Sequence, residues 1–406
     1  MTVSRRLWLQ GVMACAAVLA PAAHANAQSS NLTFPQWIAH FRPRALSGGI
    51  SARTYAQVMG GLEPDTSVFA LQRRQPEFSE QVWQYINRRV SEWRITTGRE
   101  KLREHAALFD RIERDFGVDR YLLAALWGVE TAYGDPLVQK NHMRPVFPAL
   151  AALAWGEPRR RAYWERELIN ALTIVERGWS TPAQMRGSWA GAMGHTQWMP
   201  EVWLNVGIDY DRDGRVLPFG DPADALAGSA RYLIRRGKYR RGERWGYEVR
   251  PGGAKPGSTT RSYGAWQAAG VRRADGERFA DPKISARLWA PVAGGPSFLI
   301  GQNFYSVRSY NPSMNYALAI AHLSDRLRGM GPFVHPFPGS ERILTSAELH
   351  ELQQRLTDAG FDTGGVDGRV GNATMRAVRD YQKKVGLVPA DGYAGLKVLA
   401  RLRQGH

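Results

Sequence analysis

A single Cys and a deficit of acidic residues are the first features of this 406-residue chain. One Cys excludes an internal disulfide, a CxxC redox pair and a cysteine-ligated zinc site. The chain has 37 Asp and Glu against 54 Lys and Arg, so its formal charge is +17. After the N-terminal segment, no apolar run reaches the roughly 18 residues of a membrane-spanning helix. With 44% hydrophobic residues, the composition predicts about two or three folded domains with sizeable cores.

Residues 1–27 have the pattern of a secretion signal. Arg5 and Arg6 form a basic n-region, Val12 to Ala20 is a short apolar stretch, and an Ala-x-Ala cleavage site ends the segment. We therefore expect a periplasmic protein. A weak lipobox before Cys15 leaves lipid attachment open, and the paired arginines leave twin-arginine export open. Export argues against nucleic acid as the partner of the basic chain and favours cell-envelope material.

Residues 28–330 are predicted to form one mainly helical domain. From Phe34 to about Val249, apolar residues recur three and four positions apart with charges between them. From Arg250 to about Pro296, Gly and Pro runs surround short extended segments such as Ile284 to Pro291, which predicts a loop-rich insert with a small sheet. Helical periodicity returns at Tyr316 to Leu327. The clearest helices before the insert are expected at Ser79–Arg94, Lys101–Phe116 and Arg161–Gly178.

A second, smaller module is predicted at residues 344–403. Several Pro and Gly residues between 331 and 343 cannot continue a helix, so this stretch is expected to be a linker. Three helices are expected after it, with a Gly-rich turn between the first two. Their predicted ranges are Ser346–Ala359, Asn372–Val385 and Gly395–Leu402.

Much of the positive charge lies between Arg231 and Arg287. This segment has 15 Lys and Arg and 5 Asp and Glu, so it carries +10 of the total +17. It is either a solvated face or an electrostatic approach surface beside a binding cleft.

Val118 to Glu130 is a predicted apolar helix that begins at a capping Asp119 and ends in a carboxylate. Gly134 is expected to stop the helix. A Glu at a core-facing helix end would lose solvation, which raises its pKa and suits it to general acid catalysis; the alternative is a structural ion pair. The nearest other carboxylate in sequence is Asp135, which we expect to cap the following segment.

The run from Ser188 to Pro200 combines small residues with Trp189 and Trp198. Small residues permit close backbone approach, while Ser188 and Gln197 offer hydrogen bonds beside the rings. Such a surface suits a sugar, although the same composition fits a tight crossing of two helices. Farther on, Tyr305, Tyr310, Asn311, Ser313 and Tyr316 cluster at the start of the last large helix. Taken alone, these tyrosines are expected to be packing residues with one solvent-exposed end.

An Asp-rich loop matches the first half of an EF-hand calcium loop, with carboxylates at positions one, three and five and Gly at six. Gly220 occupies position twelve, where an EF-hand has Glu, so Asp224 or Asp221 must close the loop. The alternative is a metal-free Asp turn. The predicted ligands are Asp209, Asp211, Asp213, the Arg215 carbonyl and the closing carboxylate.

Four motifs follow one another along the chain: GVETAYG at 128–134, the run at 188–200, the Asp-rich loop followed by DAL at 224–226, and YNPSMNY at 310–316. In sequence and order they resemble the lytic murein transglycosylase B family, and QPEF at 75–78 fits as well. The resemblance covers about Phe34 to Arg328. The last sixty or so residues resemble a three-helix peptidoglycan-binding domain through LQ at 352–353, VDG at 366–368 and YQ at 381–382.

The resemblance implies a mainly α fold: a goose-type lysozyme-like helical core with an EF-hand-like loop and a small β insert, followed by the peptidoglycan-binding domain. It implies cleavage of the β-1,4 bond between N-acetylmuramic acid and N-acetylglucosamine, leaving 1,6-anhydromuramyl ends. Glu130 matches the family's single catalytic acid, which afterwards acts as the base. The positions that match sugar-binding residues are Ser188, Gln197, Tyr232, Tyr310 and Tyr316.

The resemblance also implies a structural calcium ion held by Asp209, Asp211, Asp213, the Arg215 carbonyl and Asp224. Peptidoglycan glycan strands are the expected partner, with cell-wall synthases as candidate protein partners of a monomer. Ordinary glycosidases need two carboxylates, but substrate-assisted enzymes are an exception, so a one-acid mechanism is chemically consistent. The alternatives are a hydrolytic muramidase and a non-catalytic wall-binding protein.

Overall fold

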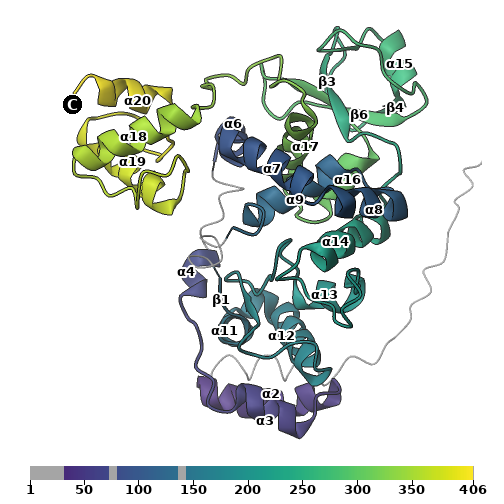
Figure 1. Ribbon diagram of the computed structural model, residues 1–406, viewed down its shortest axis with the longest axis vertical. Helices are drawn as coiled ribbons and strands as arrows, with labels where there is room; N and C mark the ends of the chain where they lie inside the picture. The colour runs from purple at the N-terminus through teal and green to yellow at the C-terminus, as the bar shows by residue number, and fades with distance from the viewer. Residues whose placement is uncertain (1–31, 73–79, 136–142, 406) are drawn as a thin grey trace, which may run out of the picture.

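The computed structural model describes residues 32–72, 80–135 and 143–405 (Figure 1). The predicted secretion signal with Cys15 and the motif at 75–78 lie outside the described residues. Within the described ranges, no helix is both long enough and apolar enough to cross a membrane. The chain is mainly helical, as predicted, and it forms four clusters of buried apolar side chains.

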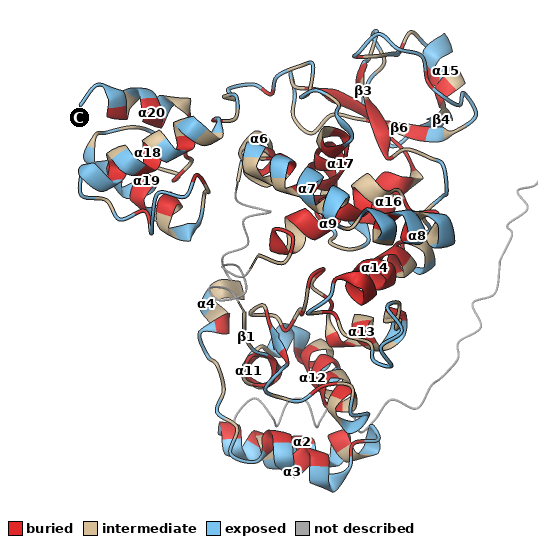
Figure 2. Cartoon of the chain, viewed as in Figure 1, coloured by how far each residue is buried: buried red, intermediate tan, exposed pale blue. Residues whose placement is uncertain are grey.

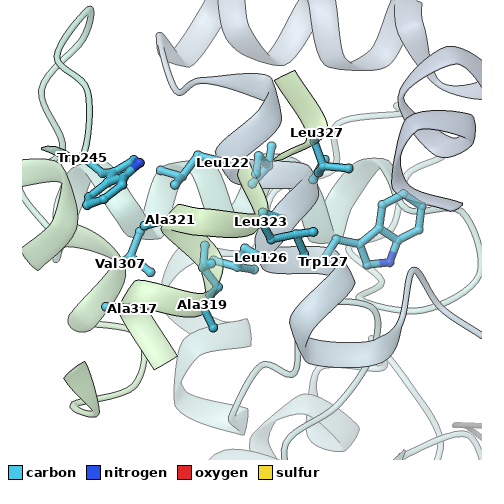
Figure 3. Packing of buried hydrophobic residues seen from close by; sticks show 14 of the residues in the cluster. Leu122, Leu126, Trp127, Trp245, Val307, Ala317, Ala319, Ala321, Leu323 and Leu327 are labelled. Carbon is cyan, nitrogen blue, oxygen red and sulfur yellow. The ribbon is translucent and has the colours of Figure 1, made fainter. Parts of the chain in front are cut away.

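The first cluster is centred on two helices that pack against each other, α9 (Arg120–Thr131) and α17 (Met314–Arg328). Figure 3 shows Leu122 and Leu126 of α9 beside Leu323 of α17 in this core. Both helices are buried over most of their length (Figure 2). The helices around them are α6 (Val82–Arg89), α7 (Glu92–Glu104), α8 (Ala106–Phe116), α14 (Ala223–Arg235) and α16 (Gln302–Arg308).

Two of the predicted helices are each broken into two. The stretch Ser79–Arg94 divides at Val90, because the Ser91 hydroxyl accepts a hydrogen bond from the Arg94 N–H (3.3 Å) and starts α7 as its N-cap. Lys101–Phe116 divides at His105, which ends α7 and begins α8. Periodicity persists across both breaks, so it could not reveal them.

A second group of helices builds a separate apolar cluster, in which α12 (Arg161–Glu176) packs against α11 (Val146–Gly156) (Figure 1). In Figure 1, α14 and the helix Pro200–Val206 (α13) lie between the α11–α12 pair and the α9–α17 pair. A two-stranded ladder joins residues just before α11 to the stretch before α13. The remaining elements are α2 (Phe34–Ser47), α3 (Ala52–Met59), α4 (Val68–Gln72), β1 (Arg144–Pro145), the 3-10 helix η2 (Pro158–Arg160), β2 (Arg186–Gly187) and α13 (Pro200–Val206).

The predicted insert is a five-stranded antiparallel sheet. Its strands lie in the order β4 (Thr260–Ser262), β6 (Ser285–Trp289), β7 (Ser297–Ile300), β3 (Gly246–Arg250) and β5 (Arg272–Arg273). The expected extended segment Ile284–Pro291 contains β6. Trp245 and Phe298 join the insert to the first helical cluster, while Tyr263 and Phe279 stack within its own core. One short helix, α15 (Tyr263–Ala268), follows β4 in the sequence.

The segment predicted as a linker is anchored to the insert. The Glu248 carboxylate of β3 accepts hydrogen bonds from the backbone N–H groups of Val334 (2.7 Å) and His335 (2.8 Å), and Phe337 is buried in the first cluster. Three helices follow, as expected. They are α18 (Ser346–Asp358), α19 (Asn372–Lys384) and α20 (Leu396–Arg403).

The C-terminal helices lie beside α6 (Figure 1), and side chains join the two parts. Asn87 of α6 donates a hydrogen bond to the Tyr393 hydroxyl (2.9 Å), and Trp83 meets the Tyr393 ring edge-on at 4.8 Å between centroids. Arg369 forms an ion pair with Asp135, five residues after Glu130. The C-terminal domain is therefore connected to the segment that follows the predicted catalytic residue.

Candidate active site

Glu130 lies in the last turn of α9, where the predicted helix places it. The Asp119 carboxylate caps the other end by accepting hydrogen bonds from the N–H groups of Tyr121 (2.9 Å) and Leu122 (3.0 Å). All residues from 122 to 128 are buried, whereas Glu130 is half-buried. The apolar helix thus anchors a carboxyl group at the border between core and solvent.

After Thr131, the last residue of α9, the chain passes through three consecutive left-handed residues. Their φ angles are 52° at Ala132, 63° at Tyr133 and 75° at Gly134. We expected Gly134 to stop the helix, but α9 already ends at Thr131. A left-handed conformation costs a non-Gly residue about 1–2 kcal/mol, and such strain concentrates at functional sites.

Tyr133 holds this left-handed turn in place. Its ring packs so closely on α9 that a Cβ atom at Gly128 would lie 2.5 Å from the ring. Its hydroxyl donates a hydrogen bond to the Arg94 carbonyl (2.9 Å), and the Arg94 Nε donates to the Gly128 carbonyl (2.9 Å). Burial lowers the pKa of Arg94 to about 10, so the guanidinium remains charged at neutral pH. A cation at a helix C-terminus is stabilising.

Tyr316 brings a phenol to Glu130 from α17, 186 positions away in sequence. The Ser313 hydroxyl caps α17, and Tyr316 in its first turn is only 3% exposed. The Tyr316 hydroxyl donates a hydrogen bond to Glu130 Oε1. The pKa of Tyr316 is raised well above its usual value, mainly by burial and also by the nearby Glu130 carboxylate. The phenol therefore keeps its proton and acts as a donor to the carboxyl group.

Tyr310 and Tyr232 lie together beside this pair. Their rings meet edge-on, with centroids 4.8 Å apart. The Tyr310 hydroxyl donates to the Thr196 carbonyl (2.7 Å), and the Tyr232 hydroxyl donates to the Ser309 carbonyl (2.8 Å). Because both hydroxyls already bind backbone carbonyls, the rings are held in fixed orientations.

The Ser188–Pro200 run forms turns and isolated β-bridges, and helix α13 begins only at Pro200. The alternative of a tight helix crossing is therefore wrong. The Ser188 hydroxyl accepts hydrogen bonds from the N–H groups of Ala190 (3.4 Å) and Ala192 (3.2 Å), which shapes the turn. Gln197 has a left-handed φ of 55°, and its amide donates to the Gly194 carbonyl (3.0 Å).

Hydrogen bonds to backbone carbonyls attach this run to the end of α9 and to Tyr310. The Thr131 hydroxyl donates to the His195 carbonyl (2.6 Å), and Tyr310 binds the adjacent Thr196. The structure therefore brings Glu130, Tyr316, Tyr310, Tyr232 and the run that contains Gln197 into one region. The hydrogen bonds described for Ser188 lie within its own turn.

The Asp-rich loop brings three carboxylate side chains close together. Carboxylate oxygens of Asp209, Asp211 and Asp213 lie within 4.8 Å of one another. The Asp213 N–H donates to both Asp209 (3.1 Å) and Asp211 (3.1 Å), which gathers the three side chains. Hard oxygen ligands at this spacing suit Ca²⁺.

Asp224 and Asp221 have different roles at the far end of this loop. Asp224 is 3% exposed, and its two oxygens accept hydrogen bonds from the N–H groups of Tyr210 (2.7 Å) and Leu217 (2.8 Å). It therefore joins the two arms of the loop. Asp221 accepts from the Ala223 N–H (2.8 Å), one residue before Asp224 at the start of α14.

The basic segment 231–287 is partly neutralised by ion pairs. They are Arg236–Glu201, Arg240–Glu243, Arg244–Asp325 and Arg273–Asp275. Arg241 and Arg244 also line a pocket of about 590 Å³ together with Asp119, Arg120 and Arg328. Both interpretations of this segment, a solvated face and an electrostatic approach surface, stay predictions.

Sequence reasoning did not identify Arg94, Tyr133 or Arg369 as supports of the site. Arg94 and Tyr133 act through backbone carbonyls, and Arg369 lies in another domain, so no local pattern marks them. Asp135, expected to cap the next segment, forms an ion pair with Arg369, and residues 136–142 lie outside the described ranges.

Residues 33–325 match the family described as the transglycosylase SLT domain, and residues 345–402 match the peptidoglycan binding domain. Membrane-bound lytic murein transglycosylase B of Escherichia coli K12 is 26% identical over 272 residues, covering 66% of this chain and 72% of that protein.

Solved structures show the same likeness. SltB3 from Pseudomonas aeruginosa, in complex with NAG-anhNAM-pentapeptide, is 35% identical with a TM-score of 0.71, and the match covers 92% of this chain and 100% of that chain. The Escherichia coli lytic transglycosylase Slt35 in complex with calcium is 24% identical with a TM-score of 0.61, covering 73% of this chain and 93% of that one. The second match shows a shared fold.

Proposed function

The chain belongs to the transglycosylase SLT domain family, and on this basis we propose that it is a peptidoglycan lytic transglycosylase that leaves 1,6-anhydromuramyl ends. The related SltB3 structure holds NAG-anhNAM-pentapeptide, which contains such an end. The observation in this chain that carries the proposal is the hydrogen bond from Tyr316 to Glu130 at the end of α9. It fixes one carboxyl group beside tyrosine rings, in the last helical turn before the left-handed residues 132–134.

Glu130 acts first as the acid and then as the base. Because the Tyr316 hydroxyl donates to Oε1, the proton of the acid form resides on the other oxygen. That proton passes to the glycosidic oxygen, and the bond between this oxygen and muramyl C1 breaks. The carboxylate then accepts the proton of the muramyl C6 hydroxyl, while the C6 oxygen forms a bond to C1. No water is consumed, and Glu130 returns to its acid form.

Neighbouring residues position the sugar in this proposal. Tyr232 and Tyr310 offer ring faces and edges, since their hydroxyls are already bound to backbone carbonyls. Gln197 and Ser188 supply polar groups from the adjoining run. The substrate's own acetamido group stabilises the developing cation, in place of a second carboxylate.

Product analysis separates this function from its closest alternative, a muramidase. The enzyme is incubated with purified sacculi, and the released fragments are analysed by mass spectrometry. Transglycosylation predicts anhydromuramyl ends, lighter by one water than the reducing ends formed by hydrolysis. A digest with reducing ends alone would establish a muramidase, and intact sacculi would favour a wall-binding protein.

We further propose that the Asp-rich loop holds a structural Ca²⁺ ion. Asp209, Asp211, Asp213, the Arg215 carbonyl and Asp224 would be the ligands, and the close approach of three carboxylates supports this assignment. Calcium should raise the melting temperature and a chelator should reverse the rise, because a ligand that binds only the folded state stabilises it. An Asp213→Asn variant should show a smaller rise. An unchanged melting temperature in the parent protein would contradict the site.

We propose that residues 1–27 direct the protein to the periplasm, where peptidoglycan lies, and that it acts as a monomer with cell-wall synthases as candidate partners. Detection of the full-length protein in the cytoplasm alone would contradict export.

A further inference from the structure

His195 lies where three parts of the site meet, and its bonds to them define its protonation. It is 8% exposed. The Trp127 Nε1–H of α9 donates to His195 Nδ1 (3.2 Å), and a tryptophan nitrogen can only donate. Nδ1 is therefore the acceptor and Nε2 carries the proton, which is donated to the Gly220 carbonyl (2.8 Å). The imidazole thus forms a bridge between α9 and the second arm of the Asp-rich loop.

The backbone of His195 repeats the same connection. Its N–H donates to the Pro218 carbonyl (2.7 Å), and its carbonyl accepts from the Thr131 hydroxyl (2.6 Å). The same Thr131 hydroxyl accepts a hydrogen bond from the Gly134 N–H (3.1 Å). Each end of the bridge is thus bonded twice, once by the ring and once by the main chain.

Close packing leaves this bridge little room to move. A Cβ atom at Gly134 would lie 2.5 Å from His195 Nδ1, and one at Gly194 would lie 2.0 Å from the Pro218 oxygen. The Trp127 indole extends from α9 away from Trp245 (Figure 3) and meets the His195 ring edge-on at 5.5 Å.

The two α9 residues held by His195 flank Glu130. Trp127 precedes it by three positions, nearly one helical turn, and Thr131 follows it directly. A shift of Pro218 or Gly220 would therefore be passed to the residues on both sides of the carboxyl group. We propose that His195 is a positioning residue that couples the Asp-rich loop to Glu130 and thereby orients the catalytic carboxyl. This inference rests on the proposed role of Glu130 as the acid.

The test compares His195→Leu with His195→Gln. Leu removes both ring hydrogen bonds, whereas the Gln amide nitrogen can still donate to Gly220 and its oxygen can accept from Trp127. Misplacement of a catalytic group by about 1 Å costs up to roughly 100-fold in rate. We expect kcat of His195→Leu to fall by roughly 10- to 100-fold with KM within about twofold, and His195→Gln to recover most of the loss.

His322→Leu is the matched control. His322 is 5% exposed and stacks on Phe333 with 3.8 Å between ring centroids, so the same change is made at an equally buried position. Hydrogen exchange, followed by mass spectrometry, supplies a readout independent of activity. In His195→Leu, exchange should accelerate both in residues 131–135 and in residues 209–224, and His322→Leu should accelerate neither.

Each contrary result overturns the inference. These results are a kcat of His195→Leu within twofold of the parent, an equal loss in His322→Leu, no recovery in His195→Gln, or faster exchange on one side of the bridge alone. Glu130→Gln is assayed in parallel to separate the two levels of the account. If Glu130→Gln is active, the proposed acid is wrong; if it is inactive while His195→Leu matches the parent, only the coupling fails.

Discussion

Replacing Tyr316 by Phe removes one oxygen atom and keeps the ring that fills the core. The lost hydroxyl is the donor to Glu130 Oε1 in a setting where Tyr316 is 3% exposed. A donor of this kind stabilises the ionised carboxylate more than the protonated acid. Without it, Glu130 should keep its proton to higher pH.

The size of the effect follows from the strength of the bond. A hydrogen bond to a charged group contributes about 1.5–3 kcal/mol, and about 1.4 kcal/mol corresponds to one pH unit in a titration. Glu130 is half-buried, so solvent will replace part of the lost bond and the lower end of the range applies. In the proposed mechanism the cycle begins with the protonated acid, so the alkaline limb of the kcat/KM profile should move upward by about one pH unit.

The assay measures kcat/KM on soluble peptidoglycan fragments from about pH 4 to 9. This pH range includes both the ordinary pKa of a Glu carboxyl group and a raised one. Tyr310→Phe is the matched control, because it deletes a hydroxyl that binds the Thr196 carbonyl. That variant can lower kcat/KM but should leave the position of the limb unchanged. Superimposable profiles for Tyr316→Phe and the parent would refute the reasoning, as would an equal shift in Tyr310→Phe.

Three further predictions concern the surroundings of the site. Gly134→Ala should lower the free energy of unfolding by about 1–2 kcal/mol in a denaturant titration, because φ is 75° and the added Cβ meets His195; parental stability would contradict this. Burial lowers the pKa of His322 to about 3, so folding stability is complete above the unfolded-state value and declines as pH falls from about 6.5 towards 3, by up to about 1.4 kcal/mol per unit. His322→Phe should flatten that decline, and an unchanged slope of stability against pH would contradict a lowered pKa for His322. Arg369→Gln removes the ion pair with Asp135 and should speed protease cleavage between residues 331 and 343, whereas equal cleavage rates would show that the pair does not hold the domains together.

Local patterns predicted the parts of the site that depend on local physics. Asp119 could be recognised as a helix cap and Glu130 as a helix-terminal carboxylate, because capping and apolar periodicity act within a few residues. The spacing of Asp209, Asp211 and Asp213 predicted their convergence for the same reason. The helices and the small sheet were likewise expected in the right order.

The rest depends on contacts between distant segments. The Tyr316 hydroxyl reaches Glu130 across 186 positions, and only the packing of α17 against α9 brings it there. The left-handed φ of Ala132 and Tyr133 contradicts the intrinsic preference of both residues, so tertiary contacts from Arg94 must enforce it. The resemblance to a family, by contrast, could name the tyrosines without explaining how they are held.

Replacing Glu130 by Gln tests the central claim most directly, because it keeps the size of the side chain and removes its ability to exchange a proton. The parent, Glu130→Gln and the exposed control Glu104→Gln are incubated with purified sacculi, and anhydromuramyl products are counted by mass spectrometry. General acid–base catalysis accelerates a reaction by about 100- to 10,000-fold. Glu130→Gln should therefore form these products at least about 100-fold more slowly than the parent, while Glu104→Gln matches the parent. Anhydromuramyl products formed by Glu130→Gln at the parent rate would contradict the account.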